Sequence, residues 1–423
     1  MRVLVNLVNT ISMFVVALVV STLLTGCTLV NNVSLKSTET TQDGQELSEK
    51  SVSTQAIPVP IASLTTVVNT ASIVQPGIYV AQHVYEIPLP TAGYRVYIIG
   101  EIHGISEVHQ LTVEYLKMLY ATGVRDIVLE ESQGYDKAAN EFVLGETETL
   151  ISDLCLRSDV LEAIRVFNQD LPHGEKVRVH LVDLDYSPVA VYAHLLNIRH
   201  RLGESAQHIV IPSLDEFQKW DESEMISLAD RLASDSEKVT PQTLQELDTV
   251  RDSVHWFHLF TVGDITTAAP PEAVSIRETR ITQNIQYLLA DLKDKPVLAL
   301  YGAWHAQKKV GDDSLGQIPW AQRLSEDGVK IHSIFAAGMY GTAFWRGKSD
   351  SPGVHPDELL FPPPEGISLE VVLSEIPDYD IVYIDLRVDT TSNLLWTSGE
   401  RASDMYDGII LFREFSPMAD ACP

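Results

Sequence analysis

Short apolar runs that alternate with longer amphipathic segments are the feature of this sequence that most restricts its fold. The runs contain many β-branched residues, which is typical of buried β-strands. The strands predicted in this way cover residues 95–99, 126–129, 177–182, 296–301, 329–335, 380–385 and 408–412. Strands that alternate with helices predict an α/β fold, in which helices flank a central and largely parallel sheet.

Apolar residues at helical spacing predict helices between these strands. Two are clear, at residues 106–121 and 275–292, and the latter follows a predicted loop at 266–274. Residues 186–260 are mostly helical in pattern and acidic. We predict that they form a helical insertion that caps the α/β domain.

The N-terminus has the pattern of a secretory signal. Arg2 precedes an almost wholly apolar stretch that ends in Leu24-Thr25-Gly26-Cys27, so we expect residues 1–26 to be a signal peptide. The four residues resemble the bacterial lipobox, which implies that Cys27 is acylated and becomes the mature N-terminus. The resemblance implies a lipid-anchored protein of the bacterial cell envelope, at the outer membrane and facing the periplasm, because Thr28 rather than Asp follows the cysteine. A single membrane-spanning helix is the alternative.

Residues 27–60 are rich in Ser, Thr, Gln and Glu and are expected to form a flexible tether, which leaves 61–423 as the α/β domain. A net charge of −28 excludes nucleic acid as a primary partner and excludes a basic patch for anionic lipid.

With Cys27 acylated, Cys155 and Cys422 remain. In an oxidising compartment they can form a disulfide, and the alternative is two separate thiols.

Polar residues follow four of the predicted strands. In open α/β sheets, ligands bind beyond the carboxyl ends of the strands, so these residues are expected to converge. They are Glu101, His103, Glu130, Glu131, Asp183, Asp185 and His305. Two histidines with nearby carboxylates suit either a general base that activates water or a divalent metal site. The signatures of zincins, serine hydrolases and P-loop proteins are absent from the sequence.

Each of these groups also has a structural interpretation. Glu101 and Glu130 can cap helices that begin at the strand ends. Arg277, Arg280 and Asn284 lie on one face of the predicted helix at 275–292. The two arginines form either a solvated edge or a clamp for an anionic substrate or transition state.

Two Gly-x-x-His elements, Gly100-Glu-Ile-His103 and Gly302-Ala-Trp-His305, resemble the superfamily that contains erythromycin esterases, ChaN-like haem-binding lipoproteins and Tiki/TraB proteins. Other matching stretches are Leu129–Glu131, Val177–Asp185, Ser275–Asn284 and Tyr406–Phe412, within a match from Tyr94 to Pro417. The sequence departs from the esterases in three places. One residue rather than two separates Glu101 from His103, the second motif has one histidine, and Glu278 stands where aspartate is more common.

The resemblance implies a membrane-anchored hydrolase in which His103 activates water for attack on an ester carbonyl. Glu101 and Glu130 would orient His103, and Arg277 and His305 would meet the oxyanion or the leaving group. The expected substrate contacts are Glu131, Asp183, Asp185 and Asn284.

The Tiki branch instead implies a divalent metal held by His103, His305 and Glu101. The ChaN-like branch implies a haem- or iron-binding outer-membrane lipoprotein without catalytic activity, in which His or Tyr is an axial ligand. The sequence therefore leaves no cofactor, a metal and haem as alternatives, with a small molecule or haem as ligand. An envelope interaction protein that kept the fold and lost the chemistry is a third alternative.

Overall fold

The computed structural model describes residues 71–234, 238–262, 270–310, 317–345, 348–352, 360–361, 373, 376, 379–396 and 399–418. The predicted signal peptide, Cys27, the tether, Cys422 and residues 266–269 of the predicted loop lie outside these residues. Within the described part of the chain, no helix has both the length and the apolar character needed to cross a membrane.

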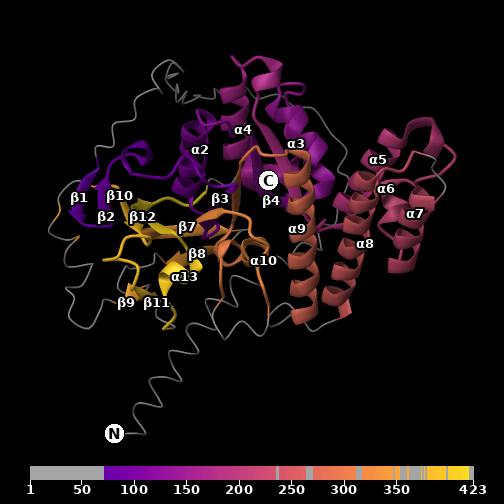
Figure 1. The fold of residues 1–423 in the computed structure, drawn as a ribbon. Helices are drawn as coiled ribbons and strands as arrows, with labels where there is room; N and C mark the ends of the chain where they lie inside the picture. The colour runs from indigo at the N-terminus through magenta and orange to yellow at the C-terminus, as the bar shows by residue number, and fades with distance from the viewer. Residues whose placement is uncertain are drawn as a thin grey trace, which may run out of the picture.

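A ten-stranded sheet forms the centre of the molecule (Figure 1). Its strands are β1 (Ser72–Gln75), β2 (Ile78–Ala81), β3 (Val96–Glu101), β4 (Asp126–Ser132), β5 (Arg178–Asp183), β6 (Val297–Gly302), β7 (Ile331–Trp345), β8 (Lys348–Pro352), β10 (Ile381–Asp385) and β12 (Gly408–Phe415). Their order is β1-β2-β10-β12-β7-β3-β6-β4-β5, with β8 paired to β7. A separate pair joins β9 (Leu360–Phe361) and β11 (Leu395–Trp396).

The six strands from β12 to β5 are parallel to one another, whereas β1, β2 and β10 form an antiparallel edge and β8 is antiparallel to β7. The predicted α/β fold with a largely parallel sheet is therefore confirmed. The hairpin of β1 and β2 was not predicted. β1 is largely exposed, and β2 is apolar and mostly buried but has only four residues, which is short for a strand to be recognised from its sequence.

Helices cover both faces of the sheet. The α-helices are α2 (Ser106–Tyr120), α3 (Asp136–Val143), α4 (Ser158–Asn168), α5 (Pro188–Leu202), α6 (Leu214–Phe217), α7 (Glu222–Ser234), α8 (Pro241–Val262), α9 (Pro271–Asp291), α10 (Trp320–Glu326) and α13 (Ala402–Met405). One core packs α2, α3 and α4 on the sheet, and the other packs α9, α10 and α13 on the opposite face. Successive residues of each strand point to opposite faces, so both sides of the strands are apolar.

The helices α5 to α8 occupy the segment predicted as an insertion. They enclose a separate apolar core that includes Leu195, Phe217, Leu228 and Val250, and α8 packs along α9 beside the sheet (Figure 1). The predicted loop at 266–274 is wrong at its end, because α9 already begins at Pro271. Proline favours the first turn of a helix, where its missing N–H has no partner to lose.

Candidate functional site

The carboxyl ends of four adjacent parallel strands form the candidate site. β3, β6, β4 and β5 are neighbours in that order, and Glu101 at the end of β3 pairs with Gly302 at the end of β6. Residues far apart in sequence meet there because parallel strands end at the same edge of a sheet. The described residues brought together include Glu101, His103, Glu130, Asp183, Arg277 and His305.

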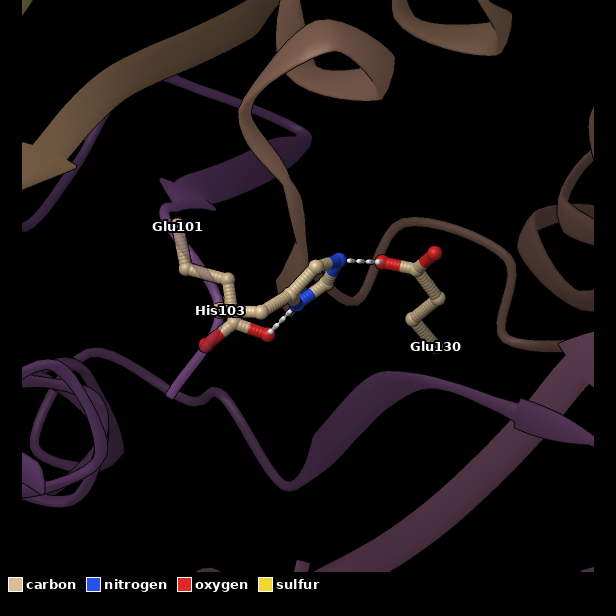
Figure 2. Close-up of side chains that lie close together, drawn as sticks. All are labelled: Glu101, His103 and Glu130. Carbon is tan, nitrogen blue, oxygen red and sulfur yellow. Dashed lines mark hydrogen bonds and ion pairs between the residues drawn. The ribbon is translucent and has the colours of Figure 1, made fainter. Parts of the chain in front are cut away.

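His103 lies between two carboxylates (Figure 2). Its Nδ1 is 2.9 Å from Oε1 of Glu101, and its Nε2 is 3.8 Å from Oε2 of Glu130. An ionised carboxylate only accepts hydrogen bonds, and of the two contacts only that of Nδ1 is within hydrogen-bond distance, so the neutral ring carries its proton on Nδ1. Nε2 then faces Glu130, and the His103 side chain is 14% exposed.

Glu101 is completely buried and shares a cluster with two further side chains. The Nη1 atom of Arg157 donates to its Oε1 over 2.6 Å, and Nε2 of His109 lies 3.8 Å from its Oε2. Burial raises the pKa of Glu101, but the charges of Arg157 and His103 outweigh burial and hold that pKa well below its usual range. Glu101 is therefore ionised at neutral pH.

Glu130 lies on the other side of His103. Its Oε1 accepts from Nη2 of Arg277 over 2.6 Å, and its Oε2 accepts from the backbone N–H of Gly302 over 2.6 Å. Burial raises the pKa of Glu130, but the neighbouring His305, His103 and Arg277 outweigh it, so the pKa lies far below the ordinary value.

Arg277, on α9, is held by Asp183 through two hydrogen bonds of 3.0 and 2.7 Å. Its Nη2 also donates to the Tyr186 hydroxyl over 2.9 Å, and its Nη1 lies 3.2 Å from Nε2 of His305. This fork geometry is the strong form of an arginine–carboxylate contact. The guanidinium therefore ties β4, β5 and α9 to the segment after β6.

His305, in the 3-10 turn η7 (Ala303–Ala306), is paired with a carboxylate that follows Arg277 on α9. Its Nδ1 lies 2.6 Å from Oε1 of Glu278, whose Oε2 accepts from the N–H of Trp320. Burial lowers the pKa of His305, but the charge of Glu278 outweighs burial and raises the pKa above the ordinary value. The Glu278 carboxylate thus favours the protonated form of the His305 ring.

The two glycines of the Gly-x-x-His elements allow the elements to pack against each other. A Cβ added at Gly100 would lie 2.7 Å from Cβ of Ala306, next to His305. A Cβ added at Gly302 would lie 3.0 Å from Nε2 of His103. Each glycine therefore makes room for the other element, which gives the repeated motif a physical explanation.

Three of the predicted substrate contacts also have partners within the protein. Asp185 accepts from the N–H of Gly134 and pairs with His194. Asn284 donates to the Val182 carbonyl over 2.8 Å, which fixes α9 on β5.

The third of these residues, Glu131, follows Glu130 on β4 and lies near Arg157, with 3.4 Å between its Oε1 and the Arg157 Nε. Adjacent strand residues point to opposite faces. Glu130 and Glu131 therefore face different clusters, which the sequence pair alone did not reveal. Arg280 pairs with Asp252 of α8 over 2.7 Å, and its side chain is only 11% exposed, so it links α9 to α8 and does not form a solvated edge.

Two members of the site were not predicted. Arg157 ends the 3-10 turn η4 (Ser152–Arg157), and His109 lies on α2. Neither belongs to a motif, so no local pattern identified them. Glu278 was noted in the sequence only as a replacement for aspartate, and its contact with His305 depends on the packing of α9 against η7.

The described residues that could bind a metal ion differ in one member from the predicted set of His103, His305 and Glu101. Among the described residues, Glu101, His103 and Glu130 each offer one ligand atom, and these atoms lie within 4.8 Å of one another. His305 is not in this set. Nitrogen and carboxylate oxygen ligands suit zinc and similar ions. Glu101 and Glu130 also accept hydrogen bonds from Arg157 and Arg277, whereas Oε2 of Glu101 is buried and has no hydrogen-bond partner among the described residues.

Comparisons with known proteins define the fold. No protein-family model matches the sequence, and the search of curated proteins gives no significant match. A solved structure of a Bacillus cereus protein is 16% identical, covers 77% of this chain and 90% of its own, and has a TM-score of 0.56. A mutant of the erythromycin esterase EreC in its open conformation is 14% identical, covers 78% of this chain and 93% of its own, and also has a TM-score of 0.56.

These matches confirm at the level of fold the resemblance to erythromycin esterases. The haem-binding ChaN of Campylobacter jejuni also matches, at 14% identity over 58% of this chain and 82% of its own. Its TM-score of 0.27 carries no argument about fold or ligand.

Proposed function

We propose that this protein is a hydrolase that cleaves an ester, or a related carboxylic bond, of a small molecule with His103 as the general base. The observation that carries the proposal is the orientation of the His103 ring. A buried and ionised Glu101 fixes Nδ1, and the other nitrogen, Nε2, faces the carboxyl edge of the sheet. A carboxylate that fixes the tautomer of a histidine is the arrangement found in histidine-based hydrolases on unrelated folds.

In this mechanism Nε2 of His103 removes a proton as the water oxygen bonds to the carbonyl carbon. Glu101 stabilises the imidazolium that forms, because it is ionised and hydrogen-bonded to Nδ1. The tetrahedral intermediate then expels the alcohol, and the proton passes from His103 to the leaving oxygen. The products are a carboxylic acid and an alcohol, and no group remains on the protein.

His305 and Arg277 provide the positive charge on the other side of the cluster. The N–H donors of Arg277 point at four side chains, and we propose that Arg277 positions them. These side chains are Asp183, Glu130, Tyr186 and His305. His305, whose protonated form Glu278 favours by raising its pKa, is proposed to stabilise the oxyanion through its positive charge.

The location follows from the sequence and is part of the proposal. A signal peptide at residues 1–26, an acylated Cys27 and a tether at 27–60 would hold the α/β domain, 61–423, at the outer membrane facing the periplasm. The insertion at 186–260 would stand beside the site as its cap. Globomycin treatment of cells would test the anchor, because a protein processed as a lipoprotein accumulates with its first 26 residues retained.

Hydrolysis is tested with the full-length protein and a panel of aryl esters, alkyl esters and macrocyclic lactones. We expect turnover by the native protein and its loss in His103→Asn. The matched control is His180→Asn, since His180 also pairs with a carboxylate, Asp126, but at the opposite end of β4 and β5. Equal turnover in His103→Asn and His180→Asn would refute the proposed base.

The same preparations separate the alternatives. Turnover that chelator abolishes and zinc restores would assign a metal to Glu101, His103 and Glu130. Stoichiometric haem uptake that is lost in His103→Asn or His305→Asn, with no turnover on any ester, would replace the hydrolase by a haem-binding protein.

A further inference from the structure

We propose that Arg157 is a positioning residue of the site, which holds Glu101 so that His103 keeps its proton on Nδ1. This inference rests on the proposed function, because it concerns how the general base is prepared. Arg157 is 1% exposed and reaches the site from η4, which lies far from both Gly-x-x-His elements in sequence.

The contacts of Arg157 explain its position. Its Nη1 donates to Oε1 of Glu101 over 2.6 Å, and the same oxygen receives Nδ1 of His103 at 2.9 Å. One carboxylate oxygen therefore joins the guanidinium to the imidazole. Charge-assisted hydrogen bonds of this length are the strongest that side chains form, so the orientation of Glu101 is set by Arg157.

Arg157 is itself fixed on two further sides. Its Nε lies 3.4 Å from Oε1 of Glu131, and Nε2 of His109 lies 3.2 Å from Nη1. The turn that carries it is anchored by the buried Leu154 and by Cys155, which is disulfide-bonded. The guanidinium is thus held between β3, β4 and α2 and has one orientation toward Glu101.

Removal of Arg157 has a specific consequence for His103. Without Arg157, the one close donor left to Glu101 among the described contacts would be His103, because Nε2 of His109 is 3.8 Å from Oε2 of Glu101. A buried carboxylate with one neutral donor is poorly compensated and changes its orientation or its protonation. The bond that selects the Nδ1–H tautomer is then lost, and in the other tautomer Nε2 carries the proton and cannot accept one from water.

The test uses the full-length protein and compares Arg157→Met with Arg157→Lys. Methionine fills similar space without charge or donors, and lysine keeps the charge but lacks the fork that reaches Glu101 and Glu131 together. The matched control is Arg125→Met, because Arg125 also pairs with a glutamate, Glu175, away from the site.

Two readouts are made on each variant. The first is kcat and KM for an ester that the native protein hydrolyses. We expect kcat to fall about 100-fold in Arg157→Met and about 10-fold in Arg157→Lys, while KM changes less than about 3-fold and Arg125→Met retains native values. A native kcat in Arg157→Met, or a loss confined to KM, would overturn the proposal.

The second readout is the tautomer of His103 by nitrogen-15 NMR of histidine-labelled protein, with the signal assigned by its absence in His103→Asn. We expect Nδ1–H in the native protein and a mixture, or Nε2–H, in Arg157→Met. This readout needs no substrate, so it tests Arg157 even where no ester is hydrolysed and the proposed function fails. If Arg157→Met folds and the tautomer of His103 is unchanged, the inference is overturned. If Arg157→Met does not fold, a native kcat together with a native His103 tautomer in Arg157→Lys overturns it.

Discussion

Gly302→Ala tests the packing of the two Gly-x-x-His elements, and the size of its effect on the rate can be worked out from the structure. The backbone at Gly302 has φ −53° and ψ 145°, which alanine adopts without strain. The new Cβ would lie 3.0 Å from Nε2 of His103 and 3.3 Å from Oε2 of Glu130. Since such contacts are comfortable at about 3.5 Å, the His103 ring must move by about 0.5 Å.

A displacement of about 1 Å in a catalytic group costs about 100-fold in rate, so a shift of half that size predicts a loss of about 10-fold in kcat. The free energy of unfolding should change by less than about 1 kcal/mol, because the ring is partly exposed and can move outward. The assay is ester hydrolysis together with urea unfolding of the full-length protein.

Two further glycines serve as controls. Gly174→Ala places its Cβ in open space and should leave both rate and stability unchanged. Gly100→Ala brings its Cβ to 2.7 Å from Cβ of Ala306 and should destabilise the fold by about 1–3 kcal/mol. Native kcat in Gly302→Ala, or a loss of stability equal to that of Gly100→Ala, would refute the reasoning.

The remaining predictions concern stability and the disulfide. Burial and the charge of Arg157 outweigh the attraction of Glu101 and lower the pKa of His109 to about 4. In the unfolded chain this histidine binds its proton near pH 6.5, so the free energy of unfolding should fall as pH falls from about 6.5 to 4. In urea titrations, His109→Gln should remove up to about 3 kcal/mol of that loss. A pH dependence that is unchanged in His109→Gln would contradict this prediction. Asp185→Ala should lower the free energy of unfolding by about 2–4 kcal/mol and leave kcat at its native value, because the variant leaves the N–H of Gly134 without its acceptor. A stable variant with a lost kcat would instead support Asp185 as a substrate contact. Peptide mapping without reduction should find Cys155 joined to Cys422, since acylation removes Cys27 from the three cysteines; a Cys155–Cys27 peptide would contradict the lipid anchor.

The strand order explains why much of the site was predictable. Buried parallel strands are visible as apolar runs, and the residue after each run lies at the carboxyl edge by geometry alone. Glu101, His103, Glu130, Asp183 and His305 follow from that rule. Which of these groups touch was not predictable, because it depends on side-chain direction and on the neighbours of each strand.

The contacts that the sequence did not indicate have the same physical origin. Asp185 and Asn284 were predicted as substrate contacts, and the structure adds their hydrogen bonds to Gly134 and the Val182 carbonyl. Arg157 was missed because a 3-10 turn has no periodic pattern and its contact with Glu101 spans two distant parts of the chain. A buried arginine next to a buried carboxylate becomes recognisable only after folding brings the two together.

The most direct test of the account is the ratio of kcat/KM between His103→Asn and His180→Asn on the ester that the native protein cleaves fastest. Both variants remove an imidazole that is paired with a carboxylate, but only His103 lies at the carboxyl edge of the sheet. A general base contributes about 100- to 10,000-fold, and the account predicts a ratio in that range with both variants folded. A ratio within about 3-fold of unity would contradict it.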